Sequence, residues 1–307
     1  MARWRYGDQT AHVVTLVFAS LVVLVTALIV LELYRSSALT REKFGWSFLF
    51  STAWDPVFER FGALPFVFGT VVTSALALLI AVPLGVGAAI FLAELAPTRV
   101  SDILSFVIEL LAAVPSVIYG LLAIFTLVPF LRSVVEPALK DWLGFLPLFQ
   151  GPAYGVGLLA AGLILAIMIV PYIVSISRDV LKAVPREMRE AALALGATRW
   201  ESTWNVVLPS ARAGILGAIF LAMARALGET MAVTMVIGND PKISSSLFAP
   251  GATIAAAIAN EFTEATGDLY VSALIELGLV LFLLTIVLNG LARLLVLRTQ
   301  PRGATNP

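Results

Sequence analysis

Residues 178–212 read RDVLKAVPREMREAALALGATRWESTWNVVLPSAR, and this polar segment lies between two long apolar ones. Only 13% of the chain is charged, yet the segment holds six of its 20 lysines and arginines, namely Arg178, Lys182, Arg186, Arg189, Arg199 and Arg212. Soluble domains carry charge on about a quarter of their residues, so this distribution is typical of a membrane protein that gathers its charges in one loop. We expect the loop to contact another molecule in the cytoplasm.

The first half of this loop predicts a short amphipathic helix. Pro185 is well placed as its first residue, and Gly196 as the residue just beyond its end. The apolar side chains between them recur three and four residues apart and share one face, formed by Met188, Ala191, Ala192 and Leu195. The opposite face is charged.

The second half of the loop predicts another short helix. Thr198 and Glu201 have the spacing of a capping box, in which each residue satisfies an amide of the other. This helix is expected to end by Leu208, because Pro209 disfavours helical geometry in the residue before it. The loop is therefore predicted to consist of a helix, a glycine turn and a second helix that ends by Leu208. Such a loop is compact enough to transmit a displacement.

The composition restricts the class of protein. The chain has 307 residues, of which 60% are hydrophobic, and a mean hydropathy of +0.96. The net charge is zero, so nothing indicates a nucleic-acid partner, and the absence of cysteine excludes disulfides and thiol chemistry. His12 is the single histidine, so it has no second histidine with which to share a metal.

Six apolar segments approach or exceed the roughly 20 residues that a helix needs to cross a bilayer. They run from 12 to 34, 66 to 95, 103 to 129, 153 to 177, 214 to 238 and 270 to 297. The first is too long for a signal peptide and lacks a small-residue cleavage site, so we expect it to be retained. The sequence predicts an all-α polytopic integral membrane protein with six transmembrane helices, divided into an N-terminal helix and outer loop at 1–65 and a five-helix core at 66–300.

Orientation follows from the distribution of lysine and arginine. With a cytoplasmic N-terminus, the segments on the inner side hold more of these residues than those on the outer side. Both termini and the 178–212 loop are therefore expected in the cytoplasm.

One spacing joins the two halves of the loop: Glu190-Ala191-Ala192, three residues, Gly196, nine residues, Val206, one residue, and Leu208-Pro209. It resembles the EAA signature of ABC-importer permease subunits, although that family usually has isoleucine where this chain has Val206. The resemblance implies a type I importer permease fold, in which the loop is a coupling helix that docks on an ATPase subunit. The docking residues it implies are Glu190, Ala191, Ala192, Gly196, Leu208 and Pro209. Without the resemblance, an ordinary solvated loop would explain the charges.

The chain has no Gly-x-x-x-x-Gly-Lys-Ser/Thr segment with which to hold ATP phosphates. We therefore expect ATP hydrolysis to belong to another polypeptide, and this chain not to be an enzyme.

The fifth apolar segment carries charges of its own. Arg225 and Glu229 are four residues apart, so on a continuous helix they share one face. An arginine near the middle of a membrane costs about 2.5–3.5 kcal/mol on insertion scales, and it usually faces a partner or an aqueous path. The residues alone leave two alternatives open, a structural ion pair and a site on a path.

Residues 225–239, RALGETMAVTMVIGN, and residues 109–120, ELLAAVPSVIYG, are similar to the C-type permease subunit of bacterial high-affinity phosphate importers. This resemblance implies a phosphate path that includes Arg225, Glu229 and Thr230. The planar fork of an arginine suits an oxyanion, and a glutamate carboxylate accepts a hydrogen bond from P–OH, which sulfate lacks at neutral pH. Our hypothesis is that Arg225 draws the anion through, while Glu229 neutralises Arg225 in an empty path and favours protonated oxyanions.

The resemblance also implies partners in the bacterial cytoplasmic membrane and on both sides of it. These are a homologous A-type permease subunit that completes a heterodimer, two ATP-binding subunits and an extracytoplasmic phosphate-binding protein; no cofactor and no metal are implied. Three alternatives remain: a permease for another oxyanion such as molybdate or phosphonate, an ion-coupled secondary transporter, and a membrane sensor or assembly factor.

Overall fold

The computed structural model describes residues 2–299, and the side chains of residues 10–294 within them; residue 300, the last of the predicted core, lies outside the described residues. The described residues form helices and no strand, as the sequence predicts. In chain order they are α1 (Ala2–Ser36), α2 (Ala38–Phe44), α3 (Ser47–Phe50), α4 (Leu64–Ile90), η1 (Phe91–Leu95), α5 (Thr98–Ala113), α6 (Ser116–Leu122), η2 (Ala123–Leu127), α7 (Val128–Phe130), η3 (Leu131–Val135), α8 (Glu136–Leu143), η4 (Pro147–Phe149), α9 (Leu158–Lys182), α10 (Arg186–Ala194), α11 (Arg199–Ser202), η5 (Thr203–Val207), α12 (Leu208–Gly228), α13 (Met231–Thr234), α14 (Ile254–Glu261) and α15 (Asp268–Thr299).

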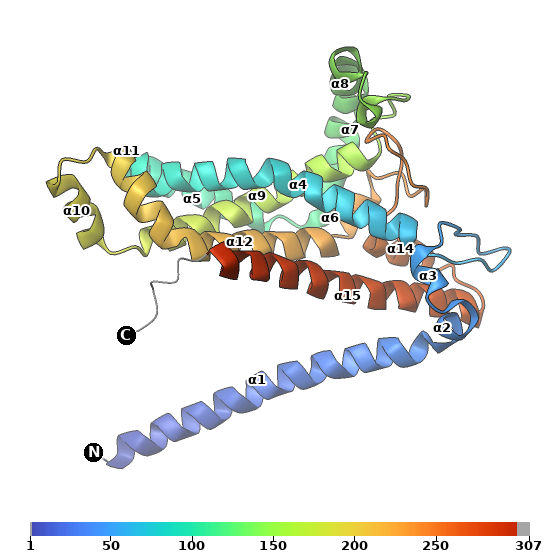
Figure 1. Ribbon diagram of the computed structural model, residues 1–307, viewed down its shortest axis with the longest axis horizontal. Coiled ribbons are helices and arrows are strands. Elements are labelled where there is room, and N and C mark those ends of the chain that lie inside the picture. The colour runs from blue at the N-terminus through green and yellow to red at the C-terminus, as the bar shows by residue number, and fades with distance from the viewer. Residues whose placement is uncertain (1, 300–307) are drawn as a thin grey trace.

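Six helices of the described part are long and apolar enough to cross a membrane, which confirms the predicted number. Helix α9 has 25 residues and so extends about 37 Å, more than the roughly 30 Å of a hydrocarbon core. Helices α4, α9, α12 and α15 run alongside one another (Figure 1), and the start of α1 and the end of α15 lie towards the same end of the molecule as α10. The arrangement is a bundle with the polar loop at one end.

The centre of the bundle is α9, which packs against α4 and α12. Small residues allow the close approach, because Ala77 and Ala81 of α4 and Ala160 and Ala161 of α9 are fully buried. A methyl group added to Gly162 would lie 2.5 Å from the Leu76 side chain, so glycine is required there by the packing. The helices therefore differ in how far the rest of the chain buries them. In the most apolar 18-residue stretch of each helix, 67% of α9 is buried, against 0% of α1.

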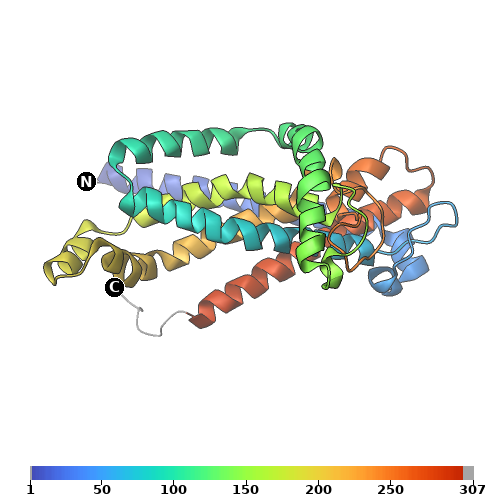
Figure 2. The ribbon, with the colours of Figure 1, turned by 90° about the horizontal axis from the view of Figure 1, so that it is seen from above.

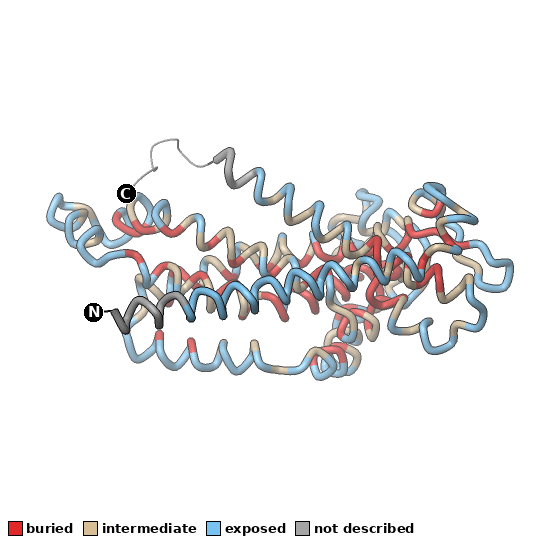
Figure 3. The backbone as a smooth tube through the Cα atoms, turned by 90° about the horizontal axis from the view of Figure 1, so that it is seen from below, coloured by how far each residue is buried: buried red, intermediate tan, exposed pale blue. Residues whose placement is uncertain are grey.

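Helix α1 stands apart from the bundle and is exposed along its described length (Figure 3). It is held at its C-terminal end, where the Arg41 guanidinium lies 3.4 Å from the centre of the Tyr34 ring and 3.8 Å from a Glu276 carboxylate oxygen. Nearby, Thr40 Oγ1 donates to Ser272 Oγ at 3.0 Å. The N-terminal helix is thus fixed to α15 near one end only.

The predicted third span, 103–129, is wrong in its boundaries. Helix α5 ends at Ala113, because Pro115 disfavours helical geometry in Val114, whose ψ is 129°. A second apolar run begins at Ser116 and continues through α6, η2, α7, η3 and α8 to Leu143. This run lies across the end of the bundle opposite α10, whereas α5 runs along the bundle (Figures 1 and 2).

The predicted stop before Pro209 is also wrong. Helices α11, η5 and α12 continue without a break from Arg199 to Gly228. The turn before Pro209 is the π-helix η5, in which the hydrogen bonds shift by one residue, so the missing N–H of the proline does not end the helix. The fifth span therefore begins inside the polar loop and ends ten residues earlier than the predicted 238, since α12 stops at Gly228.

Candidate functional site

Helix α10 carries most of the predicted docking residues, and its ends are well defined. Pro185 is its N-cap rather than its first helical residue. Gly196 has a φ of +89°, and the amides of Gly196 and Ala197 donate to the carbonyls of Leu193 and Ala192 at 3.0 and 3.1 Å. These two bonds form a Schellman motif, whose left-handed residue favours glycine. The boundaries predicted from Pro185 and Gly196 are correct to within one residue.

The apolar face of α10 is not covered by the rest of the chain. None of the residues of α10, all of which are described, is buried. Met188 is 40% exposed, and Leu195, at the end of the helix, is 90% exposed. An amphipathic helix is normally stabilised by burying its apolar face, so this face is available to a partner.

The second half of the loop forms the predicted capping box. Thr198 Oγ1 accepts from the Glu201 amide at 3.3 Å, and the Glu201 carboxylate accepts from the Thr198 amide at 2.8 Å. Trp200 and Trp204 stack with their ring centres 5.8 Å apart, and each is 55% exposed. The cap and the stacked rings give α11 a defined, partly apolar surface beside α10.

Leu208 and Pro209 lie outside α10 and α11. They open α12, and Leu208 is half-buried against a cluster that contains Val207 and Ala211. Of the predicted docking residues, the structure therefore brings together Glu190, Ala191, Ala192 and Gly196 on α10 and its cap. Leu208 packs against the bundle, whereas Pro209 beside it is exposed.

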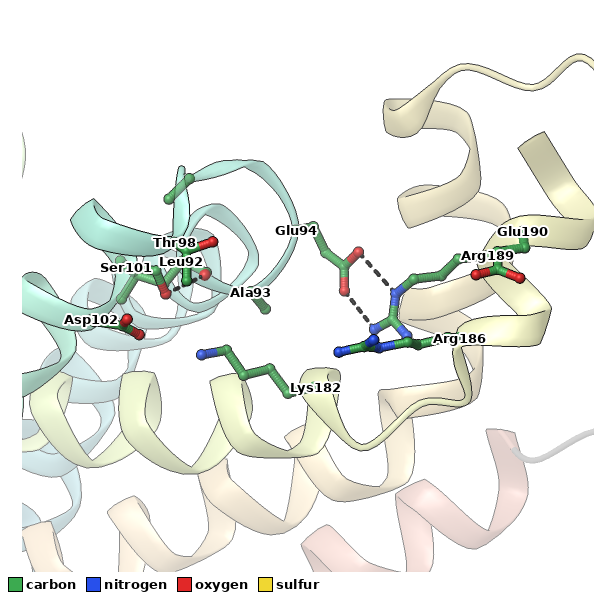
Figure 4. A pocket seen from close by; sticks show the side chains of 11 residues that line it. Leu92, Ala93, Glu94, Thr98, Ser101, Asp102, Lys182, Arg186, Arg189 and Glu190 are labelled. Atoms are coloured by element: carbon green, nitrogen blue, oxygen red, sulfur yellow. Dashed lines mark hydrogen bonds and ion pairs between the residues drawn. The ribbon is translucent and has the colours of Figure 1, made fainter.

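A hollow of about 560 Å³ lies between α10 and the segment formed by η1 and the start of α5 (Figure 4). At its wall, Arg189 Nε and a terminal guanidinium nitrogen donate to the two oxygens of the Glu94 carboxylate at 3.1 and 2.7 Å. Lys182 and Arg186 point into the same hollow. The 178–212 loop is thus attached to the bundle by a two-point ion pair beside an open space.

The second candidate site surrounds Arg225, in the last turn of α12. Its guanidinium carbon lies 4.4 Å from the centre of the Tyr172 ring of α9, in cation–π contact. Tyr172 donates to the carbonyl of Ala112 at 3.1 Å, and Tyr119 donates to that of Leu111 at 2.8 Å. The two hydroxyls thus donate to carbonyls in the last turn of α5, of which that of Leu111 also accepts from the Val114 amide at 3.3 Å.

Arg225 keeps hydrogen-bonding capacity in reserve. Its Nε is buried and has no hydrogen-bond partner among the described residues. A buried donor without a partner is costly, commonly about 1–3 kcal/mol, and native structures retain few of them. The Arg225 guanidinium therefore contacts the Tyr172 ring, and its Nε remains a donor without a partner among the described residues.

Arg225 and Glu229 lie one turn apart at the end of α12. The helix ends at Gly228, and Glu229 is its C-cap, with φ −68° and ψ 128°. The helical φ keeps the start of the Glu229 side chain where a continuing helix would place it, so only the chain after Glu229 leaves the helix. No hydrogen bond or ion pair of the described residues joins the two side chains. Thr230 follows, and its hydroxyl donates to the Gly228 carbonyl at 3.2 Å.

Sequence reasoning missed two groups at these sites. The first is the Glu94–Arg189 pair, and the second is the pair of tyrosines beside Arg225. A signal for the first existed, because Glu94 closes the second apolar segment and Arg189 lies in the loop predicted on the same side of the membrane. No signal in the sequence indicated that Tyr172 would face Arg225.

The geometry defines a class: a polytopic membrane protein with an uncovered amphipathic helix outside its bundle and a partly buried arginine within it. A model of the family described as "Binding-protein-dependent transport system inner membrane component" matches residues 81–301. The chain is 49% identical over 304 residues to the phosphate transport system permease protein PstC of Mesorhizobium japonicum, covering 98% of this chain and 93% of that one. It is 48% identical to the PstC protein of Pasteurella multocida, covering 93% and 90%. The chain belongs to this family of transport-system inner membrane components, and within it to the PstC permeases.

Solved structures agree with the family on the fold. A permease of a bacterial alginate ABC transporter, in complex with a pentasaccharide-bound periplasmic protein, superposes with a TM-score of 0.58 at 15% identity, covering 90% of this chain and 92% of that one. The inward-facing MetNI methionine ABC transporter gives a TM-score of 0.55 at 16% identity, covering 74% and 93%. The fold is that of ABC importer permeases, and the chain is a multi-pass inner membrane transport component.

Proposed function

We propose that this chain is the permease subunit of an ATP-driven importer and forms part of the path for inorganic phosphate. The observation that carries the proposal is the alignment, over 98% of the chain, with a relative named as a phosphate transport permease. The Arg225 site supports it, because a partly buried guanidinium whose Nε has no partner among the described residues suits a tetrahedral oxyanion. Molybdate and phosphonate permeases and ion-coupled transporters have no such support.

The proposal assigns partners by surface. The exposed apolar residues of α10 and the stacked Trp200 of α11 and Trp204 of η5 support docking of an ATP-binding subunit on the cytoplasmic side, one of the two that the permease heterodimer binds. ATP hydrolysis then belongs to those subunits, and both termini of this chain lie in the cytoplasm with the docking loop. A homologous A-type permease completes the path, and an extracytoplasmic phosphate-binding protein delivers the anion.

Three residues have separate roles on the path, namely Arg225, Glu229 and Thr230. Arg225 attracts the anion and donates to its oxygens, while the Glu229 carboxylate accepts from P–OH and disfavours oxyanions without a proton. Thr230 contributes a hydroxyl next to Glu229. No ion pair of the described residues joins Glu229 to Arg225, which supports a role of Glu229 on the anion rather than as a standing counter-ion.

Uptake of labelled phosphate tests the function. The complete importer is reconstituted in vesicles with ATP inside or outside, or with an ion gradient and no ATP. We expect phosphate uptake to require ATP and the binding protein. We also expect that molybdate, phosphonate and sulfate are not taken up in place of phosphate. Uptake driven by an ion gradient, or a preference for another oxyanion, would contradict the proposal.

Replacing Glu229 with glutamine is expected to lower phosphate uptake by about 10- to 100-fold, which corresponds to the loss of a charge-assisted hydrogen bond of about 1.5–3 kcal/mol. Glu229→Asp is the matched control, because it keeps the carboxylate and should retain more uptake. Both variants should reach the membrane and capture the ATP-binding subunits at the level of the unaltered chain. Unchanged uptake by Glu229→Gln would remove Glu229 from the path.

A further inference from the structure

Helix α10 has few attachments to the bundle apart from its chain connections. Three residues, 183–185, connect it to α9, and its other neighbours are α11 and η5. Since none of its residues is buried, hydrophobic packing holds it weakly. Arg189, the residue immediately before the docking residue Glu190, supplies the missing attachment.

Arg189 forms an extended set of hydrogen bonds. Besides the two bonds to Glu94, it donates to the carbonyl of Leu181 at 2.7 Å and to the carbonyl of Val184. Leu181 is in the last turn of α9, so the guanidinium also satisfies carbonyls at that helix end. One side chain of α10 therefore holds the ends of both α9 and the α4–η1 helix.

Among the ion pairs of the described residues, Glu94–Arg189 combines shielding from solvent with two-point geometry; Arg41–Glu276 is similarly shielded, at 26% and 11% exposed, but its two charged groups are 3.8 Å apart. The Glu94 side chain is only 9% exposed and that of Arg189 20%, whereas the Lys43–Glu59 pair, also 2.7 Å long, is 45% and 61% exposed. Shielded, two-point arginine–carboxylate pairs are stronger and more directional than exposed lysine pairs. The pair is suited to hold a fixed geometry.

The position of Glu94 connects the ion pair to helix α4. Glu94 lies in η1, which continues α4 without a break, and α4 packs along α9 and α12. The hollow beside the pair lies between α10 and the segment formed by η1 and the start of α5 (Figure 4). A displacement of α10 therefore reaches the α4 end through the side chains of Arg189 and Glu94.

We propose that Arg189 and Glu94 are positioning residues for transport, the joint through which movement of α10 is passed to α4. The inference rests on the proposed function, in which ATP-binding subunits move α10. With the joint broken, the subunits still dock on α10 and hydrolyse ATP, but the bundle no longer follows.

The test measures phosphate uptake and ATP hydrolysis in the same vesicles, with the complete importer and inorganic phosphate. The variants are Glu94→Gln, Arg189→Gln and the double variant, and Glu59→Gln is the matched control, since it breaks an exposed pair of equal length on another part of the chain. Capture of the ATP-binding subunits is measured in parallel.

We expect the single variants to capture the ATP-binding subunits normally and to raise the ATP consumed per phosphate by about ten-fold, the effect of losing one charge-assisted bond. The double variant should be no worse than either single variant, because both act on one interaction. Glu59→Gln should match the unaltered chain.

Provided that the unaltered chain transports phosphate, three results would overturn this inference and leave the proposed function intact. They are unchanged uptake in Glu94→Gln, a proportional fall of uptake and hydrolysis, and loss of the ATP-binding subunits. The last two would mean that the pair only stabilises the docking surface. Absence of uptake by the unaltered chain would overturn the proposed function and this inference with it.

Discussion

Replacing Arg225 with alanine is expected to abolish phosphate uptake while the importer still assembles. The guanidinium stacks on Tyr172 and keeps a buried Nε without a partner among the described residues. Two charge-assisted hydrogen bonds to an oxyanion are worth about 3–6 kcal/mol, so uptake should fall by about 100-fold or more. Assembly should survive, because Arg225 makes no ion pair within the described residues.

Arg225→Lys is the matched variant for this prediction. Lysine keeps the charge but lacks the planar fork that stacks on Tyr172, so we expect partial uptake, between those of the alanine variant and the unaltered chain. Labelled-phosphate uptake, membrane level and capture of the ATP-binding subunits are measured together. Full uptake by Arg225→Ala would remove this residue from the path and leave only the permease architecture.

The alanine variant also separates transport from a role in sensing. If a transport-dead Arg225→Ala chain still assembles and still regulates the cell's response to phosphate, the sensor alternative describes a second role of this chain. If both are lost together, the response follows from transport.

Replacing Gly196 with valine is expected to weaken capture of the ATP-binding subunits by about ten-fold, since a left-handed backbone costs an ordinary residue about 1–2 kcal/mol and a β-branched residue more. Gly196 has a φ of +89° and no heavy atom within 4 Å of an added methyl group, so the effect comes from the backbone alone. Losing the Schellman motif would redirect Leu195, the most exposed apolar residue of the helix end.

Gly196→Asn is the control, because asparagine tolerates the left-handed region better than other residues. It should keep most of the capture, measured by pulldown of the ATP-binding subunits with purified permease. Equal capture by the valine and asparagine variants would contradict a role for this turn in docking. Loss in both would indicate that the glycine itself contacts the partner.

Local patterns in the sequence predicted local structure well. Thr198 with Glu201 forms the predicted capping box, and Gly196 ends α10 in the predicted place. These features depend on residues within one or two turns, whose hydrogen bonds close over a few positions. The class of the fold followed as easily, because long apolar runs can satisfy their backbone in a membrane only as helices.

Predictions that assumed a continuous helix failed where a proline or a chain reversal intervened. Pro115 divides α5 from α6, yet Pro209 is accommodated by the π-helix η5. The same residue type therefore ends one helix and not another, and the surrounding packing decides.

By itself, the sequence determined that this chain is an α-helical membrane protein with a capped polar loop, because composition and short-range hydrogen bonding settle those properties. Only the tertiary structure decided which residues meet. Tyr172 lies over Arg225, and Glu94 holds Arg189 across 95 residues of chain. The physical reason is that such pairs depend on how α4, α9 and α12 pack, and packing is a property of all the helices together.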